Sequence, residues 1–70
     1  MNKSIFIFQS IHWVIKAEKH LVKEKIEYKI IPVPKHISSE CGMCIECQKE
    51  NIEAIKSVLH SKNIIFTLQD

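Results

Sequence analysis

Three cysteines stand close together in this chain, in the run Cys41-Gly-Met-Cys-Ile-Glu-Cys47. A cysteine thiolate can attack another sulfur atom, hold a transferred atom or ligate a metal, so its accessibility and ionisation decide its chemistry. Cys41 follows a polar segment, and Gly42 beside it permits a positive φ or the close approach of another backbone. The hydroxyls of Ser38 and Ser39 could donate hydrogen bonds to a thiolate. Cys41 is therefore a candidate for a reactive thiol, and the alternative is that it is only a small apolar residue at the start of a strand.

The same spacing matches the first three ligands of a bacterial iron–sulfur cluster. The fourth cysteine of that pattern would stand where this chain has Asn51, followed by Ile52 rather than proline. A zinc site is the other metal alternative, and its ligands would be Cys41, Cys44, Cys47 and His36. Both metal alternatives stay open at this point, as does a redox-active pair of cysteines.

The conformation of residues 41–47 bears on these alternatives. Apolar and mostly small or polar residues alternate along them, which predicts a strand with a period of two. In a strand, six steps of ~3.3 Å put Cys41 about 20 Å from Cys47, whereas zinc–sulfur bonds are ~2.3 Å long. Cys41 and Cys44 would be ~10 Å apart, against the ~4.4–6.8 Å between the α-carbons of a disulfide. A shared metal or a disulfide would therefore require a loop here.

The strands and helices that position these cysteines follow from hydrophobic periodicity. Residues 3–8 are β-branched and aromatic and predict a strand buried on both faces. Residues 28–33 predict a second strand, and its prolines place it at a sheet edge because proline cannot donate to a ladder. Residues 64–68 predict a final strand.

Two amphipathic helices are predicted, over residues 10–25 and 49–61, with Ser10 as the N-cap of the first and Asn63 as the left-handed cap of the second. The apolar arc expected to face the core from the first helix contains Ile11, Val14, Ile15, Ala17, Leu21 and Val22. Glu18 falls near the middle of this arc, so it must reach solvent at the edge or pair with a lysine or a backbone donor.

The predicted order β-α-β-β-α-β is that of the ferredoxin-like, split βαβ α+β fold, a four-stranded antiparallel sheet with two helices on one face. Within it, right-handed crossovers put the first and third strands side by side, and we expect these two to run parallel. Cys47 would then lie at the sheet end where both helices begin, which would stabilise its thiolate, although the alternation points Cys47 into the core. Cys44 and part of the segment 5–8 should face the open side of the sheet, where we expect either a homodimer contact or docking on a partner.

Composition limits the classes of function. Seventy residues, 46% of them hydrophobic, predict one domain over residues 1–70 with no room for a large substrate cleft. The net charge is only +2 and arginine is absent, so no nucleic-acid partner is expected. The apolar segment 4–15 is interrupted by polar residues and is shorter than the ~20 residues that span a bilayer, so no membrane association is expected. The odd number of cysteines does not suggest a disulfide framework, which predicts a cytoplasmic location.

Four segments, in order along nearly the whole chain, resemble one family: Phe8-Gln-Ser10, Lys16-Ala-Glu-Lys19, Ile31-Pro-Val-Pro34 and Ser38-Ser-Glu-Cys41-Gly42. They are similar to the selenium/sulfur carrier protein-like family of very small proteins. This resemblance implies that the protein is a carrier rather than a stand-alone enzyme. Such a carrier would hold sulfur or selenium on Cys41, need no cofactor, and exchange that atom with donor and acceptor enzymes.

Two features depart from the family pattern. Cys44 and Cys47 are not positions that we associate with it, and Lys25 stands where a helix-ending glycine is usual. The two additional cysteines leave open metal binding or a disulfide in this member, whereas Lys25 affects only the helix cap. Two other functions stay open beside the carrier: an interaction or regulatory domain that dimerises through its open sheet face, and a small zinc or iron–sulfur protein.

Overall fold

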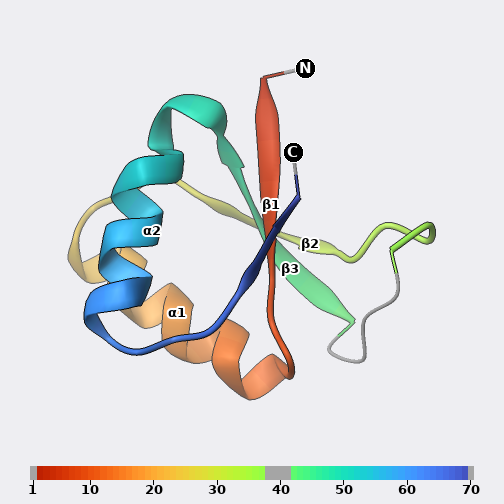
Figure 1. The fold of residues 1–70 in the computed structure, drawn as a ribbon, viewed down its shortest axis with the longest axis horizontal. Coiled ribbons are helices and arrows are strands. Elements are labelled where there is room, and N and C mark those ends of the chain that lie inside the picture. Colours follow the sequence, from red (N-terminus) through yellow and green to blue (C-terminus); the bar gives the residue numbers. More distant parts are fainter. Residues whose placement is uncertain (1, 38–41, 70) are drawn as a thin grey trace.

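The computed structural model describes residues 2–37 and 42–69, which form one sheet with both helices on the same face (Figure 1). The elements in chain order are β1 Lys3–Ile7, α1 Ile11–Lys23, β2 Lys29–Pro32, β3 Met43–Gln48, the 3-10 turn η1 Lys49–Asn51, α2 Ile52–Ser61 and β4 Thr67–Gln69. This order confirms the predicted ferredoxin-like α+β arrangement. No helix in the described part of the chain is long and apolar enough to cross a membrane.

The strand order in the sheet is β2-β3-β1-β4, and every neighbouring pair is antiparallel. The expectation that β1 and β3 run parallel was therefore wrong. The connection through α1 makes β1 and β2 parallel, and β3 is inserted between them. Because β3 follows β2 through a hairpin, it must run against both neighbours.

The strand register decides which side chains reach the helices. Phe6 lies opposite Ile45, and both are fully buried beneath the helices. Ile7 and Ile31 both lie opposite Cys44, so these three side chains share the other face. The core between sheet and helices consists of Phe6, Phe8, Val14, Ala17, Leu21, Ile45, Cys47, Ile55, Leu59 and Ile64.

The core-facing stripe of α1 is narrower than its sequence predicts. Val14, Ala17 and Leu21 are buried, but the flank of the apolar arc is exposed. The exposed fractions are 46% for Ile11, 51% for Ile15 and 59% for Val22. The helix contacts the sheet on one side and α2 on another, and β2 is the edge strand, so no element of the described residues covers the remaining flank.

Both helices end in the same Schellman motif. In α1 the N–H of Lys25 donates to the carbonyl of Val22, and the N–H of Ile26 donates to the carbonyl of Leu21. The donor–acceptor distance is 3.0 Å in both bonds. In α2 the equivalent bonds run from Asn63 to His60 and from Ile64 to Leu59. The motif requires a residue with positive φ, and the angle is 59° at Lys25 and 58° at Asn63. The predicted left-handed cap at Asn63 is thus confirmed.

The ends of two predicted strands differ from the structure for local reasons. Strand β3 begins at Met43, because the positive φ of Gly42 does not fit an extended ladder. Strand β4 begins only at Thr67, because Ile64 closes the Schellman motif of α2 and its side chain enters the core.

Glu18 has a partner that the sequence analysis did not anticipate. The hydroxyl of Tyr28, just before β2, donates a hydrogen bond of 2.6 Å to Oε2 of Glu18. Partial burial of the phenol, the hydrogen bond and the adjacent carboxylate together raise the pKa of Tyr28 to about 12. The partner is a phenol rather than the expected lysine or backbone donor, and the bond ties α1 to the edge strand.

Replacement of Lys25 by glycine should stabilise the fold. A side chain at positive φ costs about 1 kcal/mol, and a glycine at this position removes that cost. The greater freedom of glycine in the unfolded chain offsets part of the resulting gain in stability. We expect Lys25→Gly to raise the free energy of unfolding by about 0.5 kcal/mol, measured by urea denaturation. Asn63→Gly is the matched control and should give less, because asparagine tolerates this conformation. A destabilised Lys25→Gly variant would show that the lysine side chain itself is needed.

Tyr28, the only tyrosine in the chain, should lose its proton at an unusually high pH. Phenolate absorbance should report a midpoint near pH 12 for the native protein, and Glu18→Gln should move it toward 10.0. Because the folded-state pKa is raised, the stabilisation is complete below pH 10 and is lost as the pH rises toward 12. Tyr28→Phe should therefore lower stability by about 1 kcal/mol at neutral pH and weaken the pH dependence in that window. A midpoint near 10.0 in the folded protein would contradict the contact with Glu18.

Candidate functional site

The β2–β3 hairpin carries the segment in which the first candidate thiol stands. The N–H of Val33 donates to the carbonyl of Gly42 over 3.0 Å, which continues the ladder one step beyond the pair Pro32–Met43. The loop between these ends therefore starts and returns at one point of the sheet. Its first residues form a turn in which the N–H of Ile37 donates to the carbonyl of Pro34 over 3.0 Å.

Three of the predicted site residues, Ser38, Ser39 and Cys41, lie outside the described residues. Gly42, the fourth, is exposed and has a φ of 76°, as its sequence position suggested. A Cβ at this position would meet no atom within 4 Å. Glycine is therefore required here by the backbone conformation and not by a shortage of space.

The other two cysteines are held on opposite faces of β3. Cys44 faces away from the helices and is 0% exposed, whereas Cys47 belongs to the core beneath them and is 4% exposed. Both are thiols. The prediction that Cys47 points into the core is confirmed. Cys44 lies on the predicted face, but it is buried there rather than open to solvent.

Because β1 and β3 are antiparallel, Cys47 lies at a different end of the sheet from the one predicted. It lies opposite Ser4, at the end of the sheet where β1 begins and α1 finishes. Only α2 starts near this end, and η1 stands between it and Cys47. The expected stabilisation of its thiolate by two helix N-termini was therefore wrong.

The geometry of β3 bears on the metal alternative. Cys44 and Cys47 project from opposite faces of an intact strand, so one ion cannot bind both. His36 lies on the face of Cys44, in a hollow that also includes Ile5 and Glu46. Within residues 2–37 and 42–69, no three histidine, cysteine or acidic side chains gather closely enough to hold a metal.

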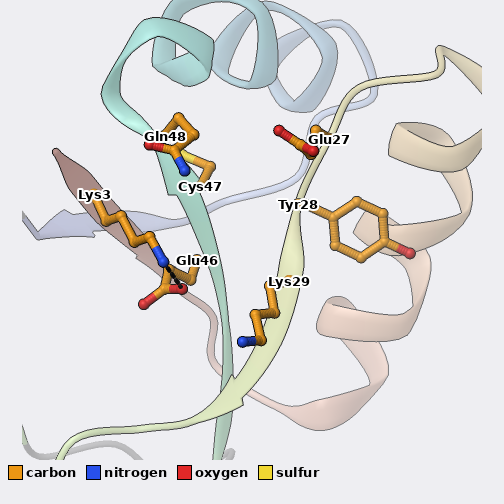
Figure 2. Close-up of a pocket in the computed structure, with 7 residues that line it drawn as sticks. All are labelled: Lys3, Glu27, Tyr28, Lys29, Glu46, Cys47 and Gln48. Carbon is orange, nitrogen blue, oxygen red and sulfur yellow. Dashed lines mark ion pairs between the residues drawn. The ribbon is translucent and has the colours of Figure 1, made fainter.

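A small hollow at the end of the sheet brings one cysteine near charged groups, as Figure 2 shows. Its volume is about 230 Å³, and it is lined by Lys3, Glu27, Tyr28, Lys29, Glu46, Cys47 and Gln48. Nζ of Lys3 lies 3.6 Å from Oε1 of Glu46 across the β1–β3 pair, and Lys29 lies opposite Glu46 in the register of β2 with β3. The tyrosine hydroxyl points away from the hollow toward α1 (Figure 2).

This hollow offers little chemistry to Cys47. Its thiol is almost fully buried, and the carboxylate of Glu46 offsets the charge of the neighbouring lysines. Sequence reasoning did not single out Lys3 or Lys29, and the only available signal was the alternation that puts them on the same face as Glu46.

A second hollow, of about 520 Å³, lies between the start of the β2–β3 loop and the sheet face that the helices leave open. Pro34, His36 and Ile37 line it from the loop, and Ile5 lines it from β1. In Figure 1 this part of the loop lies on the opposite side of the sheet from the helices. The open face is thus partly covered by the chain's own loop.

Comparison with known families identifies a match over most of the chain. The family described as "putative Se/S carrier protein-like" matches residues 3–67, which include every helix and the whole β2–β3 hairpin. No curated protein and no solved structure matches the chain. The four sequence segments that resemble this family all lie within the matched residues. The chain belongs to the Se/S carrier protein-like family.

Proposed function

We propose that this protein is a carrier that accepts sulfur or selenium on Cys41 and passes it to a partner enzyme. The observation that carries the proposal is the family match over residues 3–67. A carrier needs a thiol that a second protein can reach, and a buried thiol cannot meet that requirement. Cys44 and Cys47 are both buried in the sheet, which leaves Cys41 as the cysteine suited to the role.

The neighbourhood of Cys41 in the chain supports this assignment. Gly42 is exposed and adopts a conformation that other residues resist, so the chain can turn sharply next to the thiol. The ladder bond between Val33 and Gly42 anchors the loop at its base. The loop is therefore attached to the rigid central strand β3, while its own residues carry the chemistry.

The transfer step is a thiol–persulfide exchange. The Cys41 thiolate attacks the terminal sulfur of a donor persulfide, a new sulfur–sulfur bond forms on Cys41, and the donor's sulfur–sulfur bond breaks. The donor cysteine leaves as a thiolate and takes up a proton, so no external oxidant or reductant is needed. A donor selenosulfide would react in the same way. We further propose a cytoplasmic location, where cysteines stay reduced.

The expected homodimer through the open sheet face stays a prediction. Ile7 and Cys44 on that face are already buried, and Ile5 is partly buried. The large exposed hydrophobic side chains of the described residues lie elsewhere, on α1 and at Ile65. Dimerisation through the open sheet face, the basis of the interaction-domain alternative, therefore has no specific support from the exposed hydrophobic side chains.

Intact-mass analysis after incubation with a cysteine desulfurase and cysteine should show added sulfur on the protein. Cys41→Ser should abolish the gain, because its hydroxyl cannot form a persulfide. Cys44→Ser should retain the gain and serves as the matched control. A label that persists in Cys41→Ser would assign the carrying thiol to another cysteine, and no label from sulfur or selenium donors would contradict the carrier function.

A further inference from the structure

The outward face of α1 is uniformly basic. Successive residues of a helix are rotated by about 100°, which gathers five basic side chains on the side away from the core. They are His12, Lys16, Lys19, His20 and Lys23. No carboxylate stands on this face, because Glu18 lies on the flank and accepts the hydrogen bond of Tyr28. The lysines are therefore not neutralised by their own helix.

This face is shaped as well as charged. A hollow of about 360 Å³ is lined by His12, Ile15, Lys16, Lys19 and His20. The half-buried ring of Trp13 supports two of these side chains from below. Nζ of Lys16 lies 5.1 Å from the centre of the ring, and the imidazole of His12 meets it edge-on at 5.5 Å. The basic groups thus stand on a packed aromatic base.

An apolar flank runs beside the basic face. Ile11, Ile15 and Val22 are about half exposed and follow one another along the same side of the helix. Among the described residues, the only other large hydrophobic side chain exposed to this degree is Ile65. A basic surface next to an apolar strip is the complement of an acidic surface that carries an apolar patch.

The position of this face relates it to the proposed function. Helix α1 begins where β1 ends, and the β2–β3 hairpin loop leaves and re-enters the sheet at that same end. A protein bound along the first turns of α1 would therefore meet the end of the sheet to which the loop of Cys41 is attached.

We propose that the outward face of α1, with its apolar flank, is the docking surface for a protein that presents an acidic surface with an apolar patch. The identification of that protein as a sulfur or selenium donor or acceptor rests on the proposed function. The charge complementarity does not, since it follows from the residues of α1 alone.

A protein partner fits these residues better than other classes of macromolecule. The widest apolar face of α1 is used by the core, and only the narrow flank of isoleucine and valine remains to enter a lipid surface. The chain has no arginine for phosphate forks. A second copy is a poorer fit, because the chain carries ten lysines against eight acidic residues and is itself net positive at +2.

The partner can be captured and then measured. A photo-cross-linking amino acid is placed at Lys19 in the full chain, and at Lys62, the C-cap of α2, as the control position, in the cells that make the protein. We expect Lys19 to cross-link to a protein of acidic composition that Lys62 does not reach. That partner is purified, and its dissociation constant is measured at low and high salt with two variants.

The variants carry the same change of net charge. Lys16→Glu with Lys19→Glu reverses the docking face, and Lys49→Glu with Lys62→Glu reverses two lysines outside it. We expect the first pair to weaken binding at least about tenfold at low salt and the second less than about threefold, with the difference reduced at high salt. Circular dichroism checks that both variants are folded.

Loading of Cys41 from a small-molecule persulfide separates the two proposals. It should be unchanged by the α1 reversal, since it needs no protein docking, and its failure in every variant would count against the carrier function alone. The docking proposal is overturned if Lys19 cross-links no more than Lys62, if it cross-links to lipid, nucleic acid or a second copy, or if the captured protein binds both variants equally.

Discussion

The antiparallel pairing of β1 with β3 at the centre of the sheet is the constraint on which the other features depend. It places Phe6 against Ile45 on the helix side and Ile7 against Cys44 on the other side. A shift of one residue in β3 would exchange its two faces and bring Glu46 and Gln48 beneath the helices in place of Ile45 and Cys47. The core that holds α1 and α2 in place therefore also fixes where each cysteine of β3 lies.

That constraint sorts three closely spaced cysteines into different environments. Cys47 is part of the core, and Cys44 is buried on the far face beside Ile7 and Ile31. Gly42 ends the ladder with a positive φ, and Cys41 comes before it in the chain. A run that resembles a ligand set in the sequence is thus divided by secondary structure, and this division supports the carrier proposal over a shared metal.

The sequence predicted the elements well because their signals are local. Residues 3–8 could hardly form anything but a buried strand, and Asn63 marked the end of α2. What it could not predict depends on contacts between distant segments. The direction of β3 relative to β1 follows from the whole chain path, and the Glu18–Tyr28 bond joins residues that no periodicity relates. The exposure of Ile11, Ile15 and Val22 depends on how many helices share one sheet face. The periodicity of a single helix gives no information about the number of its neighbours.

The fold buries Cys44 and Cys47, and we propose that it leaves Cys41 for chemistry. The most direct test measures the alkylation rate of each cysteine in the native protein, resolved by peptide mass mapping, and compares it with the rate in urea. We expect Cys44 and Cys47 to react at least about a hundredfold more slowly in the native protein than in urea, because reaction requires opening of the sheet. We expect Cys41 to react at nearly its unfolded rate. Fast alkylation of Cys44 or Cys47 in the folded protein, with Cys41 protected, would contradict this proposal.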